Sequence, residues 1–360
     1  MTDAAAGASA LTVLQRTTCP YCGVGCGVEI LSADGGAGVS VRGDAAHPAN
    51  KGRLCSKGSA LAESLTLPHR LTQPLWDGAP VPWDLALDEI GARLQEVLAD
   101  DGPEAVAFYG SGQLLTEDYY VLNKLAKGFI GTSNVDTNSR LCMASTVAGH
   151  KQSFGSDTVP GLYDDWELAD LVVLVGSNTA WCHPVLFQRL LAARKRRGLK
   201  IIVLDPRQTA TTADADLHLP LRGGSDIALF SGLLRAIAEA GAVKAAYVAD
   251  HTRGLAEAVA AAPDLATVAD TTGLSPVQIA AFYKLFIDTP KVVTVFSQGI
   301  NQSSHGSDSV SAILNVHLAT GRIGTPRLRP VLDHRPAERD GRARSRRARQ
   351  PTRRPYGFCV

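Results

Sequence analysis

Four cysteines near the amino end constrain the fold of this chain more than any other feature. Cys19, Cys22, Cys26 and Cys55 follow the spacing C-x2-C-x3-C-x28-C, with glycines in the short gaps. Three thiolates within eight residues and a fourth from further along the chain can hold the corners of a cuboidal iron–sulfur cluster. The glycines let the backbone wrap closely around such a cluster. The spacing therefore predicts a [4Fe–4S] site.

Two other uses of these thiols are a structural zinc site and disulfides. Zinc sites usually present two separated pairs of ligands, which the crowded triplet fits poorly. The remaining cysteines are Cys142, Cys182 and Cys359, and the odd total of seven does not suggest a disulfide framework. Thiols that bind a cluster indicate a reducing compartment. Cys182 has no partner motif, and we expect it to be a packing residue.

Length and composition limit the classes of protein to which this chain can belong. With 360 residues, 45% of them apolar, the chain can form two or more domains. The first eighteen residues lack a basic start, a long apolar run and a twin-arginine pair, so they do not resemble an export signal. No stretch approaches the ~18 apolar residues that span a bilayer. We therefore expect a cytoplasmic protein without a membrane segment.

The composition and the hydrophobic pattern of the chain change along its length. Residues 1–10 are small and polar, and we expect them to be disordered. Residues 11–70 are predicted to form a small cluster-binding domain with short strands at 28–30 and 39–41, followed by a proline-rich linker at 68–83. Residues 71–326 alternate between strand and helix patterns, which predicts a Rossmann-like α/β fold with a parallel sheet. The first elements expected there are a helix from an Asp84 N-cap to Leu98, a strand over 105–109 and a helix over 117–129.

The clearest unit is a βαβ crossover over residues 170–206. Leu171–Val175 is a continuous apolar run, as expected of a strand buried on both faces. A loop over 176–184 leads into a helix over 185–197 that ends at Gly198, and a second strand covers 201–205. Two further strand–loop–helix pieces are expected at 218–240 and from 292 onward, and residues 250–285 are mostly helical in pattern.

Loops at the carboxyl ends of the predicted strands could hold a nucleotide. Four of them combine glycine with Asn, Ser or Gln, which supply donors for phosphates and base edges. Asp205 could accept a hydrogen bond from a ribose or a purine. Neither G-x-G-x-x-G after a strand nor G-x-x-x-x-G-K-[ST] occurs, so a standard NAD or NTP site is not indicated. A single Gly-Ser turn is often structural, but the four loops together favour a nucleotide-like cofactor.

Cys142 lies in the segment Asn138-Ser139-Arg140-Leu141-Cys142-Met143. An isolated cysteine is usually a small buried hydrophobe. Here it lies between the cluster unit and the nucleotide-type loops, where a soft thiolate could bind a redox metal.

These residues together resemble the molybdopterin oxidoreductase superfamily, and within it bacterial assimilatory nitrate reductases, over Thr17 to Thr325. The resemblance implies a [4Fe–4S] cluster on the four cysteines and a molybdenum bis(molybdopterin guanine dinucleotide) cofactor. It implies that Lys57 lies between cluster and pterin and assists electron transfer, and that Cys142 ligates molybdenum. The positions that match cofactor-holding segments are Gln113, Asn138, Gly176, Ser177, Asn178, His183, Asp205, Arg207, Thr209, Gly224, Asp226, Gln298 and Asn301.

The implied reaction is reduction of nitrate, with two electrons and two protons, to nitrite and water. Electrons would pass from ferredoxin or an NADH-dependent flavoprotein through the cluster and Lys57 to the pterin. The nearest alternative is a formate dehydrogenase, which usually carries His after its metal-binding residue, where this chain has Met143. An alternative of another class is a non-catalytic iron–sulfur electron-transfer or nucleic-acid-binding protein.

The family pattern continues to Pro326 and then stops. Residues 327–360 contain eleven arginines, no lysine and three acidic residues, which is typical of a disordered basic arm that binds nucleic acid. GC-rich DNA read out of frame has the same composition. Codons for this stretch, read one base later, can encode Gly-Cys-Gly-Pro-Phe-Ser-Ile-Thr-Gly-Gln-Pro, which resembles the continuation in this family. We therefore expect a frameshift near Pro326 and a disordered tail without a nucleic-acid role. The chain would then be incomplete relative to the family, and as written inactive and prone to aggregation.

Overall fold

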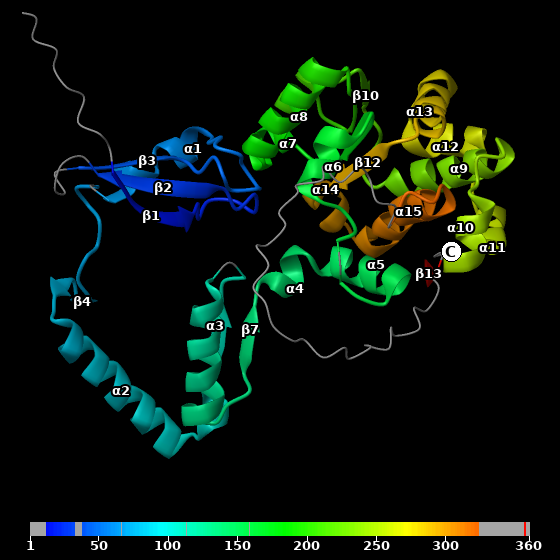
Figure 1. Cartoon of the computed structure of the whole chain (residues 1–360). Coiled ribbons are helices and arrows are strands. Elements are labelled where there is room, and N and C mark those ends of the chain that lie inside the picture. Colours follow the sequence, from blue (N-terminus) through cyan, green and yellow to red (C-terminus); the bar gives the residue numbers. More distant parts are fainter. Residues whose placement is uncertain are drawn as a thin grey trace, which may run out of the picture. The chain divides into compact units, whose positions relative to one another are not determined.

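The computed structural model describes residues 12–32, 38–65, 67–112, 114–157, 159–323 and 356–357. The chain divides into two compact units. The first unit comprises 1–14, 30–41 and 56–144, and the second comprises 15–29, 42–55 and 145–360. The predicted cluster domain, residues 11–70, thus contributes segments to both units. Residues 1–10, predicted to be disordered, lie outside the described residues. Figure 1 labels the elements.

A three-stranded sheet of order β1-β2-β3 frames the cysteines. Its strands are β1 (Thr12–Thr18), β2 (Gly27–Ser32) and β3 (Val39–Gly43), of which β1 had no counterpart in the sequence prediction. Glu29 on the middle strand accepts hydrogen bonds from Arg16 Nη2 at 2.8 Å and from Arg42 Nε at 2.6 Å. These cations hold the pKa of Glu29 below its usual range. The cross-strand ion pairs therefore fix the carboxylate in its charged form.

Within the predicted linker the structure contains a β-hairpin. Its strands are β4 (Leu75–Trp76) and β5 (Ala79–Pro80), joined by Asp77 and Gly78 at φ values of 49° and 81°. Two consecutive positive φ angles define the tight turn that Asp-Gly favours. Before this hairpin the chain forms α1 (Ser56–Ser59) and the 3-10 helix η2 (Leu61–Leu65).

The long helix α2 (Trp83–Asp100) corrects one prediction. Pro82, not Asp84, is its N-cap, because the extended Pro82 backbone (φ −61°, ψ 150°) ends the preceding segment one residue before Trp83. Asp84 lies in the first turn, where its charge still favours the positive end of the helix. None of the α2 residues is buried.

The rest of the first unit is built around a two-stranded parallel pair. After η3 (Pro103–Ala105), strand β6 (Phe108–Gly110) pairs with β7 (Val135–Thr137). Between them α3 (Thr116–Asn123) continues into the π-helix η4 (Lys124–Ile130), which ends at the left-handed Gly131. The short helix α4 (Ser139–Cys142) follows β7. The predicted strand at 105–109 therefore begins later than expected, whereas the predicted helix is confirmed.

A four-stranded parallel sheet of order β10-β9-β8-β12 forms the centre of the second unit. The strands are β8 (Leu171–Val175), β9 (Lys200–Leu204), β10 (Leu217–Leu219) and β12 (Val292–Phe296). The predicted strand at 171–175 is confirmed residue by residue, and all five side chains are buried. Because β9 and β12 flank β8 on opposite sides, the topological switch point lies between β8 and β12.

Helices cover both faces of this sheet, as an all-parallel arrangement requires. Leu171, Val173 and Val175 belong to the larger core, which includes residues of α9 (Asp226–Glu239), α13 (Pro276–Asp288) and α15 (Gly306–Ala319). Val172 and Leu174 point to the other face and pack with α8 (Pro184–Arg197). Gly198, at φ 71°, ends α8 as predicted. The predicted α/β class with a parallel sheet is confirmed.

The other elements of the second unit are short. They are α5 (Ala144–Phe154), α6 (Tyr163–Leu168), α7 (Thr179–Cys182), η5 (Ala210–Asp214), α10 (Ala245–His251), β11 (Thr252–Arg253), α11 (Leu255–Ala260), α12 (Leu265–Thr272) and α14 (Gln298–Asn301). Tyr356–Gly357, inside the segment predicted to be disordered, form strand β13 parallel to β11. The remainder of 327–360 lies outside the described residues. Across the described ranges, no helix combines the length and apolar character needed to cross a bilayer.

Candidate functional site

The three clustered cysteines lie in a tight loop that we call the first cysteine arm, residues 19–26. The Cys19 amide donates to Cys26 O at 2.8 Å, and Gly25, at φ +65°, donates to Cys22 O at 3.3 Å. A left-handed residue at this position favours glycine. The sequence therefore folds here into a hairpin whose two ends bring Cys19 and Cys26 together.

Cys55 joins them from the segment 42–55, the second cysteine arm. Burial, together with the smaller effect of the nearby thiols of Cys22, Cys19 and Cys55, raises the pKa of the Cys26 thiol to about 11. None of the four is in a disulfide. The structure thus assembles the predicted four-cysteine array from two separated stretches of chain.

Glycines permit close packing next to the first arm and within the second arm. A Cβ added to Gly27, which follows Cys26, would lie 2.4 Å from His47 Cβ in the second arm. A Cβ added to Gly43 would lie 2.3 Å from Gly52 O. Only glycine permits these approaches, so the fold of the array depends on these small residues as well as on the cysteines.

The donor set fits an iron–sulfur cluster. Burial and, to a lesser extent, the neighbouring thiols disfavour the charged form of Cys26, and a cationic iron core would offset both effects. Three ligands within eight residues and a fourth from further along the chain suit the corners of a cluster better than the two separated pairs usual for zinc.

Lys57 lies on α1, two residues beyond Cys55, and its side chain is exposed. The chain itself keeps it next to the array. Its predicted role between cluster and pterin stays a prediction.

The predicted cofactor loops of the second unit gather at the carboxyl edge of the four-stranded sheet. At the switch point Gly176 (φ +53°) meets Gly299, whose amide donates to Gly176 O at 3.0 Å. A Cβ on Gly299 would lie 2.6 Å from Gly176 Cα, so neither position has room for a side chain. Bare backbone at a switch point is where a ligand can approach closely.

The loop after β8 is held by hydrogen bonds of its own side chains. Ser177 Oγ and Thr179 Oγ1 lie 2.9 Å apart, and Asn178 Oδ1 accepts from Thr211 Oγ1 at 2.8 Å. His183 ends the loop, and its Nε2 lies 4.0 Å from where a Cβ of Gly23 would be. Burial lowers the pKa of His183 below its usual value, so the ring is neutral at pH 7. This histidine therefore brings the loop after β8 next to the first cysteine arm.

The loops after β9 and β10 bring two carboxylates together. Buried Asp205 accepts from the Arg207 amide at 2.9 Å. Burial raises the pKa of Asp226 to about 6, and the nearby Asp205 carboxylate adds to the rise. Gly224, at φ +83°, lies exposed in the turn before Asp226. Such a pair can accept hydrogen bonds from the amino and imino groups of a base.

Thr209 provides a second test of whether these loops fit a nucleotide. Its Oγ1 atom is buried and has no hydrogen-bond partner among the described residues. Buried hydroxyls are normally paired. A polar ligand at this edge of the sheet would satisfy it, so the loops fit the expected cofactor.

Asn301 has a structural role that the sequence did not reveal. Its Oδ1 accepts from the Thr146 amide at 2.9 Å and from Thr146 Oγ1 at 2.7 Å, and its Nδ2 donates to Gln298 Oε1 at 3.0 Å. The side-chain amide thus ties α14 to α5. Its predicted cofactor contact remains a prediction, as does that of Gln298.

In the first unit, Asn138 organises the segment that carries Cys142. Its Oδ1 accepts from the Gly112 amide at 2.5 Å, and its carbonyl accepts from the Leu141 and Cys142 amides, both at 2.9 Å. Cys142 is half-buried in α4, beyond the carboxyl end of β7. Gln113 lies outside the described residues. Asn138 therefore connects the loops that follow the two parallel strands.

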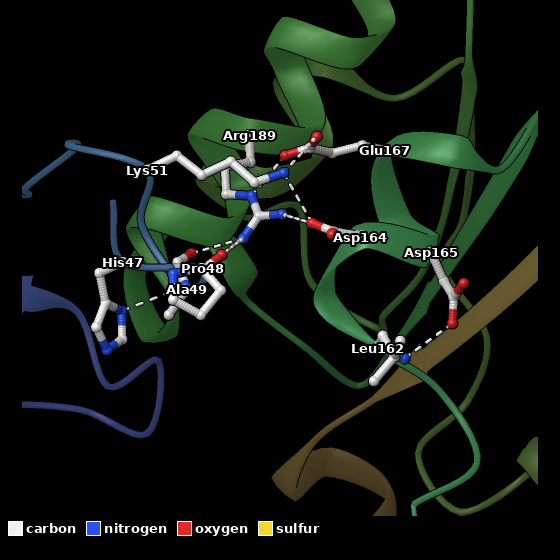
Figure 2. A network of polar contacts seen from close by, with 9 residues as sticks. All are labelled: His47, Pro48, Ala49, Lys51, Leu162, Asp164, Asp165, Glu167 and Arg189. Atoms are coloured by element: carbon white, nitrogen blue, oxygen red, sulfur yellow. Dashed lines mark hydrogen bonds and ion pairs between the residues drawn. The ribbon is translucent and has the colours of Figure 1, made fainter. Parts of the chain in front are cut away.

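Cys182 corrects a prediction. It is exposed at the end of α7, because the four-residue helix turns this face away from the core. The structure also identifies three residues that the sequence analysis did not single out, Asn50, Tyr163 and Arg189. Figure 2 shows the polar network around Arg189, which contacts both α6 and the second cysteine arm.

Two family models match the chain. Residues 13–66 match the molybdopterin oxidoreductase Fe4S4 domain, and the four cysteines of the array lie within this range. Residues 70–332 match the molybdopterin oxidoreductase domain. The second match covers well over half of the chain.

Curated relatives are similar over most of this chain but are much longer. A nitrate reductase from Klebsiella oxytoca is 55% identical over 312 residues, covering 86% of this chain and 36% of the relative. A nitrate reductase from Shewanella frigidimarina is 49% identical, covering 87% of this chain and 34% of the relative. An F420-dependent formate dehydrogenase subunit from Methanococcus maripaludis is 35% identical and covers 86% and 46%. The chain thus spans about a third of the two nitrate reductases.

A solved structure shares the fold. Acetylene hydratase from Pelobacter acetylenicus superposes with a TM-score of 0.72 at 24% identity, covering 86% of this chain and 44% of that one.

Proposed function

The chain belongs to the molybdopterin oxidoreductase family, and on this basis we propose that it is the amino-terminal part of a nitrate reductase catalytic subunit. The observation that carries the proposal is the assembled four-cysteine array, which lies in the same compact unit as the loops at the carboxyl edge of the parallel sheet. Greater similarity to nitrate reductases than to the formate dehydrogenase supports the choice of substrate.

Electrons would reach the site through the cysteine array. Cys19, Cys22, Cys26 and Cys55 would hold the cluster, and the exposed Lys57 would carry a positive charge just beyond it. A cation next to a reducible centre favours its reduced state electrostatically. Ferredoxin or an NADH-dependent flavoprotein is the proposed donor.

The sheet-edge loops would hold the guanine dinucleotides. Asp205 and Asp226 would accept hydrogen bonds from a guanine edge, and the orphaned Thr209 hydroxyl would pair with the same ligand. Gly176 and Gly299 would let a diphosphate approach bare backbone. Arg207, exposed beside this edge, could pair with a phosphate.

Cys142 would supply the thiolate that ligates molybdenum, with Asn138 fixing the start of its helix. When bound, the molybdenum cofactor supplies two-electron oxygen-atom chemistry that converts nitrate to nitrite. The residues of this chain hold and orient that cofactor and bring charge to it.

The finer assignment is an assimilatory, cytoplasmic enzyme. The motif Gly176-Ser-Asn-Thr-Ala-Trp-Cys-His-Pro184 supports the assimilatory type, and the use of cluster-forming thiols is consistent with a reducing compartment.

A formate dehydrogenase is the second candidate, because a relative with that activity is similar over the same residues. Met143 after Cys142 argues against it, since those enzymes usually place His there.

The test uses the full-length protein obtained by restoring the reading frame near codon 326, purified without oxygen. Reduced viologen with nitrate should yield nitrite, formate with an oxidised viologen should yield no reduction, and molybdenum and iron should both be present. Cys142→Ala should abolish nitrite formation while leaving the iron content unchanged. Formate oxidation without nitrite formation would support the second candidate instead.

A further inference from the structure

Arg189 on α8 is a buried cation with partners on two separate parts of the chain. Its side chain is 1% exposed. Nε donates to Glu167 Oε1 at 2.5 Å, and Nη2 donates to Asp164 Oδ1 at 2.6 Å. Both carboxylates belong to α6. A charge this deeply buried persists only when it is paired, so these contacts join α8 to α6.

The remaining nitrogen of Arg189 binds the second cysteine arm. Nη1 donates to Pro48 O at 2.9 Å and to Ala49 O at 2.6 Å. Lys51 Nζ reaches back to Asp164 Oδ1 at 2.8 Å and to Glu167 Oε2 at 3.2 Å. Figure 2 shows that Arg189 and Lys51 both bond to the carboxylates of Asp164 and Glu167. Hydrogen bonds and ion pairs at residues 48–51 therefore hold the second arm to α6 and α8.

Asn50, within this fastened stretch, connects it to both sets of cysteines. Asn50 is fully buried. Its amide exchanges two hydrogen bonds of 2.9 Å with the Gly27 backbone, next to Cys26. Its Nδ2 also donates to Arg53 O at 2.9 Å, two residues before Cys55. A shift of residues 48–51 would therefore move Cys26 and Cys55 relative to each other.

Tyr163, the first residue of α6, holds the first cysteine arm separately. Its hydroxyl donates to Gly23 O at 3.0 Å. Gly23 follows Cys22 directly, so this bond limits the movement of the loop between Cys22 and Cys26. One helix thus contacts both arms, through Tyr163 in one case and through the Arg189 network in the other.

We propose that Arg189 and Tyr163 are positioning residues of the iron–sulfur site, which set the separation of the two cysteine arms. Neither residue is a ligand. Partners beyond the ligands commonly change the strength and electronic properties of a metal site because they orient the ligands. The proposal depends on the cluster and is independent of the reaction at molybdenum.

The test compares three variants of the full chain after anaerobic reconstitution with iron and sulfide. Arg189→Met removes the hydrogen bonds of Arg189 to the second arm and to α6, and Tyr163→Phe removes only one hydroxyl. Arg194→Met is the matched control, because Arg194 lies on the same helix and binds Asp216 at 2.8 Å but contacts neither arm. Circular dichroism reports folding, and the rate of iron loss to a chelator and the EPR spectrum of the reduced cluster report the site.

We expect Arg189→Met to lose iron to the chelator roughly tenfold faster than the parent chain, with an altered EPR spectrum. Tyr163→Phe should change both readouts in the same direction by less, and Arg194→Met should leave both unchanged. Parental iron loss and spectrum in Arg189→Met would overturn the proposal, as would equal changes in Arg194→Met. If Arg189→Met does not fold, Tyr163→Phe provides the test. An EPR spectrum and a rate of iron loss equal to those of the parent chain in Tyr163→Phe would then overturn the proposal.

Discussion

Gly176 and Gly299 meet backbone to backbone where β8 and β12 end, with the Gly299 amide donating to Gly176 O at 3.0 Å. A Cβ on Gly176 would lie 2.8 Å from Gly299 Cα, and a Cβ on Gly299 would lie 2.6 Å from Gly176 Cα. The two loops at the switch point are therefore held together by an approach that only glycine permits. The proposed diphosphate site depends on this pair.

Gly299→Ala should destabilise the second unit by roughly 1–3 kcal/mol, because its methyl group would overlap backbone that cannot move aside. Urea unfolding measures this free energy. Gly223→Ala is the control, since nothing lies within 4 Å of its Cβ position at the same sheet edge. Equal midpoints for Gly299→Ala and the parent chain would contradict the described packing.

Asp226 should make stability fall as the pH rises. Its pKa of about 6 lies above that of an exposed Asp, so the folded chain keeps a proton that the unfolded chain releases near pH 4. Stability is therefore lost between about pH 4 and 6, and the full cost remains above that interval. At pH 7 the free energy of unfolding of Asp226→Asn, measured with urea, should exceed that of the parent by about 2 kcal/mol. Below about pH 4 the two should differ little. A gain of the same size at both pH values would contradict this cause.

The α2 helix should make the 360-residue chain self-associate. Trp83, Leu87 and Ile90 lie along one side of the helix and are 61%, 57% and 56% exposed. Exposed apolar surface of this kind promotes association. The double variant Leu87→Gln/Ile90→Gln should reduce light scattering and dye binding. Val277→Gln, at an isolated exposed position on α13, should not. No difference between these variants would show that other surfaces cause association.

The same chain should form no nitrite from nitrate with reduced viologen, because it spans about a third of the nitrate reductases that it matches. Nitrite formation by the purified 360 residues, at a rate that depends on Cys142, would contradict this expectation.

Nucleotide sequencing around codon 326 should reveal a second reading frame. We expect the frame one base later to encode a glycine- and cysteine-containing continuation, in place of the arginine-rich residues 327–360. The expectation rests on the composition of residues 327–360, which contain eleven arginines and no lysine. The segment shows no periodicity from which a core could form. An intact frame without that continuation would refute the frameshift.

Local patterns predicted the parts of the fold that depend on local physics. The strand Leu171–Val175 could be predicted because a strand covered on both faces is apolar at every position. Gly198 could be predicted to end its helix because glycine readily takes the left-handed φ that the structure shows there. The cysteine array could be predicted because three of its four cysteines lie within eight residues.

Long-range partners could not be read in this way. Arg189 bonds to residues more than a hundred positions away, and a basic residue in a helix usually indicates a solvated face. Tyr163 and Asn50 have no local motif that marks their bonds to the cysteine arms. Cys182 was predicted to be buried because cysteines usually are, but the orientation of α7 exposes it.

The most direct test of the account is the metal content of the four-cysteine site. Anaerobic reconstitution of the full chain, followed by iron, sulfide and zinc analysis, should give about four iron and four sulfide per chain, as one [4Fe–4S] cluster requires. Cys26→Ser should lower that content strongly, whereas Cys182→Ser, at an exposed cysteine outside the array, should not. One zinc per chain without sulfide, or an iron content that Cys26→Ser leaves unchanged, would contradict the central claim.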